Sequence, residues 1–142
     1  MDIKTLSPSY AVSPQIAVED IPAIVAAGFK TIICNRPDAE VPPSHQAAAI
    51  RSAAETHGLA FVDIPVTHMG LNEEMVAAQK AAIGTPEAPT LAYCASGNRS
   101  SIVWGLAMAD SMSADEIIAA TDAAGYNLGG LRPQLEAMGQ TN

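Results

Sequence analysis

Apolar positions along the chain follow two patterns. Short runs rich in β-branched and other apolar residues are separated by longer, Ala-rich segments. A short apolar run bounded by turn residues is typical of a buried strand, whereas longer Ala-rich segments favour helices. Three runs predict buried strands, at residues 30–34, 59–64 and 89–93. Residues 5–16, interrupted by two prolines, predict an extended or hairpin segment ahead of these strands.

The Ala-rich segments carry recognisable helix start and stop signals. Ser44 and Asn72 are predicted N-caps, and Ser113 to Glu116 has the pattern of a capping box. The predicted helices cover residues 18–27, 44–57, 72–84, 100–110, 113–125 and 129–138. Strands and helices therefore alternate. This order predicts a single α/β domain over residues 1–142, with a mainly parallel central sheet and helices on both faces.

Three loops follow the predicted parallel strands, and they carry most of the candidate chemistry. They contain Cys34-Asn35-Arg36, residues 65–70 and the segment that begins at Cys94. Because parallel strands present their carboxyl ends at one edge of a sheet, we expect these loops to meet there. Ligands of such folds bind at that edge.

The loop from Cys94 to Arg99 is the strongest functional signal. It joins a strand to a helix, so its backbone N–H groups at Ala95, Ser96, Gly97 and Asn98 are expected to form a nest for an anion. The nest and the helix N-terminus favour a Cys94 thiolate. Gly97 permits the positive φ that such a loop needs.

Side chains around this loop suggest further roles. Arg99 offers a planar cation to a bound oxyanion, and Ser100 or Ser101 is placed to donate a hydroxyl to the sulfur. A buried strand-end cysteine beside a solvated arginine is the simpler interpretation of Cys-x4-Arg alone. Strand, glycine, Arg-Ser and helix together favour Cys94 as a nucleophile and Arg99 as its catalytic partner.

Residues 93–101 (YCASGNRSS) resemble the active loop of rhodanese-type sulfurtransferases. Over residues 5–138 the chain resembles the phosphatase-like domain of the β-lactamase hydrolase-like family, which has a dual-specificity-phosphatase-like fold. The segments that carry this second resemblance are residues 26–33, 35–38, 64–67, 91–94 and 124–126. The resemblance implies a cysteine-phosphatase-like fold.

Two features separate this chain from the phosphatases it resembles. Phosphatases share a Cys-x5-Arg loop, whereas Cys94 and Arg99 are separated by four residues. A shorter loop suits a smaller guest, such as the terminal sulfur of a persulfide. Phosphatases of this fold also need an aspartic acid about thirty residues before the cysteine. Asp63 has that spacing but lies before the apolar segment that the acid usually follows, and His68 is the other candidate.

These features predict sulfane-sulfur transfer through a Cys94 persulfide. The expected donor is a small anion, thiosulfate or glutathione persulfide, and the acceptor is a thiol such as glutathione, or cyanide. No cofactor is expected. The resemblance implies sulfide detoxification with a persulfide dioxygenase as partner. The alternatives are a cysteine-dependent phosphatase with Asp63 or His68 as acid, and a non-catalytic sensor of persulfide or oxidant.

Two further residues have two interpretations each. Arg36 is either a second cation for the donor's sulfonate or carboxylates, or a loop arginine paired with Asp38. Cys34 is either a resolving thiol for Cys94 or an inert strand-end cysteine.

Composition excludes several other classes. The formal net charge of -8 argues against a nucleic-acid partner. The sequence has neither an apolar run of membrane-spanning length nor a secretory signal pattern, so we expect no membrane partner. Two distant cysteines predict reduced thiols in the cytoplasm. Three scattered histidines give no metal-ligand spacing.

Overall fold

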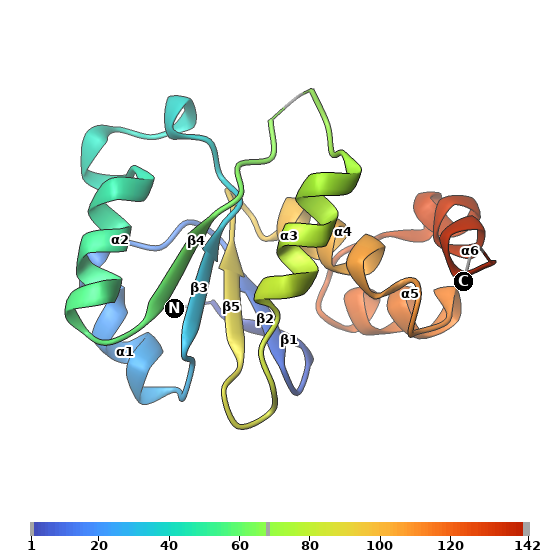
Figure 1. Cartoon of the computed structure of the whole chain (residues 1–142), viewed down its shortest axis with the longest axis horizontal. Coiled ribbons are helices and arrows are strands. Elements are labelled where there is room, and N and C mark those ends of the chain that lie inside the picture. The colour runs from blue at the N-terminus through green and yellow to red at the C-terminus, as the bar shows by residue number, and fades with distance from the viewer. Residues whose placement is uncertain (1, 68, 141–142) are drawn as a thin grey trace.

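The computed structural model of the chain describes residues 2–67 and 69–140. Its centre is a five-stranded sheet with the order β1-β2-β5-β3-β4 (Figure 1). β1 pairs with β2 antiparallel, and the other neighbours pair in parallel. The strands are β1 Lys4–Ser7, β2 Tyr10–Ser13, β3 Thr31–Cys34, β4 Ala60–Asp63 and β5 Thr90–Tyr93.

Helices cover both faces of this sheet. α1 and α2 lie on one face and α3 to α6 on the other (Figure 1). The helices are α1 Ile21–Ala26, α2 Ala47–Thr56, α3 Glu73–Ala82, α4 Asn98–Met108, α5 Ala114–Ala123 and α6 Arg132–Gln140. The predicted mainly parallel α/β architecture is confirmed, including the N-terminal hairpin.

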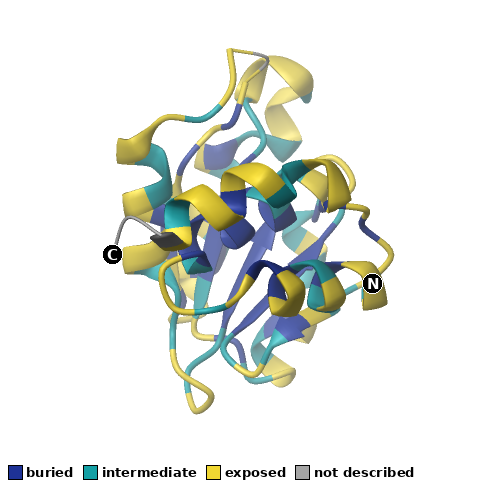
Figure 2. Cartoon of the chain, turned by 90° about the vertical axis from the view of Figure 1, so that its right-hand side faces the viewer, coloured by how far each residue is buried: buried dark blue, intermediate teal, exposed yellow. Residues whose placement is uncertain are grey.

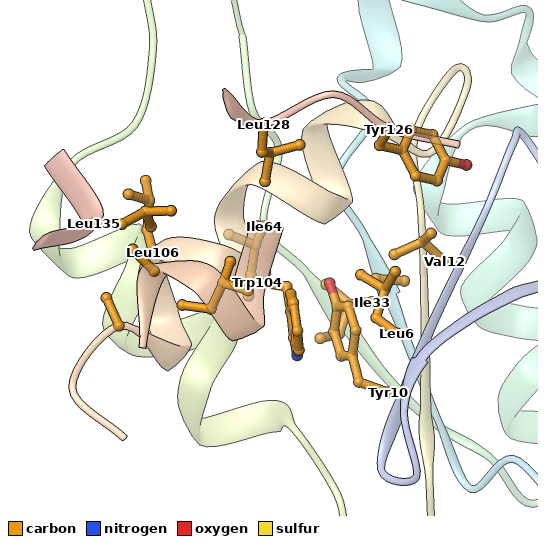
Figure 3. Close-up of a cluster of buried hydrophobic side chains, with 14 residues drawn as sticks. Leu6, Tyr10, Val12, Ile33, Ile64, Trp104, Leu106, Tyr126, Leu128 and Leu135 are labelled. Atoms are coloured by element: carbon orange, nitrogen blue, oxygen red, sulfur yellow. The ribbon is translucent and has the colours of Figure 1, made fainter. Parts of the chain in front are cut away.

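The strands separate two apolar clusters, because successive side chains of a strand point to opposite faces. Ile32 and Leu91 pack toward α1 and α2, whereas Ile33 and Ala92 pack toward α3 to α6. Figure 2 shows the buried strands beneath helices whose outer surfaces are exposed. Figure 3 shows the cluster on the α3-to-α6 face, where Tyr10 of β2 stacks on Trp104 of α4 with ring centroids 6.0 Å apart.

Four predicted helix starts were wrong. The helices expected from residues 18 and 129 open with 3-10 turns, and α1 and α6 begin three residues later. Ser44 lies in a short 3-10 turn, and α2 begins only at Ala47, whose N–H donates to Asp38 Oδ1 at 2.8 Å. The carboxylate of Asp38 thus supplies the cap that the sequence assigned to Ser44. α4 begins at Asn98 rather than Ser100, because Gly97 takes a left-handed conformation that lets the helix start at once.

The N-caps predicted at Asn72 and Ser113 are confirmed. Asn72 accepts a hydrogen bond from the Met75 N–H, and Ser113 forms the reciprocal capping box with Glu116. Among the residues that the structure describes, no helix combines the length and apolar character needed to cross a bilayer.

Candidate active site at the carboxyl end of the sheet

Cys94 directly follows β5, which lies between β2 and β3 in the sheet. The residue is 1% exposed, and the Gly97 N–H donates to its Sγ at 3.1 Å. The Cys94 N–H donates to the Ser13 carbonyl at 3.4 Å, so its backbone continues the pairing of β5 with β2. The thiol is therefore fixed at the carboxyl end of the parallel strands, with a loop amide directed at the sulfur.

Gly97 is the position that gives the loop its shape. Its φ is +97°, and a Cβ there would lie 2.2 Å from the hydroxyl oxygen of Tyr126. That hydroxyl donates to the Ser96 carbonyl at 2.8 Å. The segment after α5 thus closes over the loop, and only glycine meets both the backbone and the space requirement.

Arg99 lies in the first turn of α4 and is held by two groups from other loops. Its Nη1 and Nη2 donate to the Glu40 carboxylate at 2.8 and 2.7 Å, and Nη1 also donates to the Val66 carbonyl at 2.9 Å. These contacts hold the two Nη atoms of the guanidinium in place between the loops after β3 and β4. Hydrogen bonding to Glu40 raises the pKa of Arg99, and the charge of Cys94 adds to the rise.

Arg36 reaches the same carboxylate from the loop after β3. Its Nε donates to Glu40 Oε1 at 3.1 Å, and its Nη1 donates to Gln15 Oε1 at 3.4 Å. The loop pairing predicted with Asp38 is instead made with Glu40. The two arginines, Arg99 first, hold the pKa of Glu40 below its usual value. The carboxylate therefore stays ionised between two cations.

Glu40 is a site residue that the sequence reasoning missed. Its spacing of four residues from Arg36, in a loop at the carboxyl edge of the sheet, is the signal that could have identified it. The loop after β4 also contributes, because the Val66 carbonyl binds Arg99. All three loops that follow β3, β4 and β5 thus meet at one edge, as the sequence predicts.

The remaining loop residues have defined contacts. The Asn98 N–H donates to Ser96 Oγ at 3.3 Å, and the Ala95 carbonyl accepts from the Gln15 N–H at 3.4 Å. The Ser100 hydroxyl donates to Asn35 Oδ1 at 2.9 Å. Ser101 donates to the Gly97 carbonyl at 2.8 Å.

The predicted hydroxyl donation to sulfur is therefore not seen. Because both serines of the α4 first turn already donate to oxygen acceptors, the contact at Cys94 Sγ comes from the Gly97 amide.

Asp63 is not brought to Cys94. It pairs in register with Cys34 in β4 and β3, so its side chain points to the face covered by α1 and α2. Cys94 continues the alternation of β5 and points to the other face. Partial burial and the charge of Asp38 raise the pKa of Asp63. His68, the other candidate acid, lies outside the described residues.

Cys34 is also directed away from Cys94. It lies opposite Tyr93 in the β3–β5 register and packs in the cluster beneath α1 and α2. Burial raises its pKa to about 11. Both cysteines are free thiols. This placement favours the interpretation of Cys34 as inert packing over a resolving role.

Other candidate binding features lie elsewhere. Within residues 2–67 and 69–140, no group of three His, Cys, Asp or Glu side chains is arranged to hold a metal ion. A hollow of about 650 Å³ lies between α3, α4 and α6, with Val76, Lys80 and Leu106 among its lining residues. No residue from Cys94 to Arg99 lines it, so it is separate from the thiol site.

Comparisons with known proteins identify relatives of this chain. A β-lactamase hydrolase-like protein of Xylella fastidiosa is 31% identical over 131 residues, which are 91% of this chain and 30% of that protein. This chain thus spans less than a third of the length of that relative.

Solved structures show the same fold. The crystal structure of a candidate phosphatase from Neisseria meningitidis is 38% identical, with a TM-score of 0.81 over 97% of this chain and 99% of that one. Tk-PTP, at 16% identity, superimposes with a TM-score of 0.73 over 99% and 98% of the two chains. The family described as "Beta-lactamase hydrolase-like protein, phosphatase-like domain" matches residues 2–111. The chain therefore belongs to this family of phosphatase-like domains, on a cysteine-phosphatase-like fold.

Proposed function

We propose that this domain is a cysteine-dependent sulfurtransferase that carries sulfane sulfur on Cys94. The observation that supports the proposal is the short loop. Four residues separate Cys94 from Arg99, and the Gly97 N–H already lies 3.1 Å from Sγ. A loop closed this tightly already directs one amide at the sulfur and suits a single added sulfur atom, whereas a phosphoryl group has three oxygens to accommodate.

The proposed chemistry has two steps. The Cys94 thiolate attacks the outer sulfur of thiosulfate, so an Sγ–S bond forms and the bond from that sulfur to the sulfonate breaks. Sulfite leaves with the electron pair, and the enzyme carries a persulfide anion. A thiophile such as cyanide then attacks the outer sulfur and regenerates the thiolate. With glutathione persulfide as donor, the glutathione thiolate leaves in place of sulfite.

This reaction suits the groups around Cys94. Sulfite and thiolates are stable leaving groups, so neither step requires a general acid. Glu40 is unsuited to that task because Arg99 and Arg36 keep it ionised. Asp63 lies on the other face of the sheet.

The two arginines indicate an anionic donor. Arg99 interacts with Cys94, and both Arg99 and Arg36 bind the Glu40 carboxylate. We propose that Arg99 binds the sulfonate or persulfide, while Arg36 attracts further negative groups such as the carboxylates of glutathione. The acceptor is then a thiol in a reducing cytoplasm, and a persulfide dioxygenase is the proposed partner in sulfide oxidation.

A phosphatase is the second candidate, and the comparisons are the observation that favours it. The family is named for a phosphatase-like domain, and the neisserial relative at 38% identity is described as a candidate phosphatase. The Cys94 thiolate and Arg99 would then act on a phosphoryl group. The general acid of that reaction would be a group other than Glu40 or Asp63.

Two assays separate these candidates. Intact mass spectrometry after incubation with glutathione persulfide is expected to show one added sulfur, located on Cys94. Turnover of thiosulfate with cyanide is then compared with hydrolysis of an aryl phosphate. Aryl-phosphate hydrolysis at enzymatic rates, with thiosulfate and glutathione persulfide untouched, overturns sulfur transfer. Stable modification of Cys94 with turnover of neither substrate supports a sensor instead.

A further inference from the structure

A buried set of hydrogen-bonding side chains lies beneath the Cys94 loop. It consists of Tyr10 on β2, Asn35 after β3, Gln79 on α3 and Ser100 on α4. Asn35, Gln79 and Ser100 are each 0% exposed, and so is Tyr10. Four polar residues without solvent contact on four separate elements are costly to bury unless they bond one another.

Their hydrogen bonds close a ring. The Gln79 Nε2 donates to the Tyr10 hydroxyl at 2.9 Å and to Asn35 Oδ1 at 3.0 Å, and the Asn35 Nδ2 donates back to Gln79 Oε1 at 2.9 Å. Ser100 joins twice. Its hydroxyl donates to Asn35 Oδ1 at 2.9 Å, and its carbonyl accepts from the Tyr10 hydroxyl at 2.8 Å.

The ring uses almost all of the bonding capacity of its side chains. The second Asn35 Nδ2 hydrogen bonds to the Ile64 carbonyl at 2.9 Å, so both amide hydrogens of Asn35 and both of Gln79 are donated. Burial raises the pKa of Tyr10, which keeps its hydroxyl a neutral donor. Figure 3 shows the aromatic side chain of Tyr10 packed against Trp104 of α4.

Gln79 is the member that a folding role alone does not explain. It is the one buried residue of α3, on a helix whose other described residues are partly or fully exposed. It occupies the apolar stripe of that helix with Met75, Val76 and Ala82, where an aliphatic side chain is the ordinary choice. Its amide instead connects α3 to the first turn of α4.

Ser100 is the member of this hydrogen-bonded ring that lies next to the active-site loop, because it directly follows Arg99. Through Tyr10 and Asn35, it fixes both the hydroxyl and the carbonyl of the α4 first turn. That turn carries the guanidinium of Arg99 and begins at Gly97, whose N–H faces the sulfur. A displacement of α4 at Ser100 therefore moves both groups relative to Cys94.

We propose that Gln79 is a positioning residue, which acts through Asn35, Tyr10 and Ser100 to hold the first turn of α4 in register with Cys94. The role in turnover rests on the proposed sulfur transfer, whereas the effect on Cys94 reactivity does not. Misplacement of reacting groups by a fraction of an ångström lowers kcat more than it raises KM.

The test uses Gln79→Leu and Gln79→Glu in the full chain. Gln79→Leu removes all three of its hydrogen bonds and is expected to lower kcat for thiosulfate–cyanide turnover about tenfold, with KM changed less than about threefold. A buried carboxylic acid keeps one donor and one acceptor, so Gln79→Glu is expected to recover part of kcat. The alkylation rate of Cys94 by iodoacetamide is expected to fall in the same order.

Thr121→Val is the matched control. Thr121 is buried and donates to the Ile117 and Ile118 carbonyls within α5, so this change also removes a buried hydroxyl but outside the ring. It is expected to lower the melting temperature without changing kcat or the alkylation rate. A merely structural Gln79 would behave in the same way as this control.

Each outcome decides the proposal. A folded Gln79→Leu protein with wild-type kcat and a wild-type alkylation rate overturns it. If that variant does not fold, Tyr10→Phe takes its place. It removes the two hydrogen bonds of the Tyr10 hydroxyl and keeps the aromatic side chain stacked on Trp104. Wild-type behaviour of Tyr10→Phe then overturns the proposal. If the wild-type protein transfers no sulfur, the proposed function fails, and the alkylation rates alone decide the role of Gln79.

Discussion

Cys34 and Cys94 stand at the carboxyl ends of neighbouring strands, yet the structure gives them different surroundings. Cys34 is the last residue of β3 and packs under α1 and α2, where burial raises its pKa to about 11. Cys94 is the first residue beyond β5 and meets a loop amide and the first turn of a helix. A shift of one residue along the strand exchanges the two faces of the sheet.

The comparison separates two environments for a cysteine at the end of a strand. Both residues are almost inaccessible, at 2% and 1% exposure, so burial does not distinguish them. The difference lies in the donors around the sulfur. Cys34 contacts a backbone acceptor, the Arg36 carbonyl, at 3.3 Å, whereas Cys94 Sγ receives a backbone donor at 3.1 Å. The two sulfurs therefore differ in their hydrogen-bond partners, and burial is the main cause of the raised pKa of Cys34.

Replacing each cysteine by serine gives the largest predicted difference. Cys94→Ser is expected to lower sulfur transfer at least about 1,000-fold, because a hydroxyl is scarcely ionised at neutral pH and carries no persulfide. Cys34→Ser is expected to keep most of the activity. The measurement is thiosulfate–cyanide turnover, with melting temperatures showing that both variants are folded.

If Cys34→Ser lost activity together with Cys94→Ser, a disulfide cycle between the two thiols would have to replace the persulfide scheme. Substantial activity in Cys94→Ser would instead place the nucleophile elsewhere.

Lengthening the loop tests why Cys94 differs. One glycine inserted between Gly97 and Asn98 creates Cys-x5-Arg spacing and moves the Gly97 amide relative to the sulfur. Sulfur transfer is expected to fall roughly 10- to 100-fold as the persulfide loses this donor. Binding of tungstate or vanadate, measured by calorimetry, is expected to become tighter because a tetrahedral oxyanion gains room.

The matched control is a glycine inserted between Gly129 and Gly130. This turn lies outside the site, and a side-chain carbon at Gly130 would meet no atom within 4 Å. The control is expected to leave both measurements unchanged. A rate of sulfur transfer that is unchanged or higher in the variant with the lengthened Cys94 loop would contradict the spacing argument.

Glu40→Gln tests the arginine side of the comparison. It replaces a charged acceptor between Arg99 and Arg36 by a neutral one, so the guanidinium of Arg99 is held less firmly. Turnover is expected to fall about tenfold through kcat. Glu55→Gln, which removes an exposed carboxylate 3.9 Å from Arg51, is expected to have no effect.

The pH dependence of this contact has a defined sign. The pKa of Glu40 is lowered in the folded protein, first by Arg99 and then by Arg36. Its contribution to stability is therefore present above pH 4.5, the ordinary value, and is lost as pH falls through the lowered value. Melting temperatures of wild type and Glu40→Gln are expected to converge in acid. If the difference between the two melting temperatures persists in acid, the destabilisation by Glu40→Gln comes from lost packing and not from lost charge pairing.

Much of the fold was predictable because local signals and the global pattern agree. Buried apolar runs gave three strands, and the caps at Asn72 and Ser113 fixed two helix starts. Ser44 failed because the competing cap comes from Asp38, which lies in an earlier turn of the same loop. Long-range capping leaves little trace in a local pattern.

The site was predictable only in part. The loop from Cys94 to Arg99 is contiguous in sequence, so its chemistry shows directly. Glu40 and Tyr126 reach it from other elements, and their roles depend on tertiary contacts. Gln79 had a readable signal, a polar amide on the apolar stripe of a helix, but its partners lie 44 and 69 residues away.

The last predicted effect is confined to alkaline solution and concerns Cys34. Burial raises its pKa from an ordinary 9.0 to about 11, so between these values the unfolded chain releases a proton that the folded protein keeps. The unfolded state is then favoured as pH rises, and the free energy of unfolding is expected to fall by up to about 2–3 kcal/mol on this account. Cys34→Ala removes this titration. We therefore expect the melting temperature of the wild type to fall more steeply above pH 9.0 than that of the variant, with the two curves parallel at neutral pH. Iodoacetamide provides an independent check, because at neutral pH it should label Cys94 and leave Cys34 unlabelled in the native protein. Parallel melting curves throughout, or equal labelling of the two thiols, would show that the two faces of the sheet do not impose different chemistry on these cysteines.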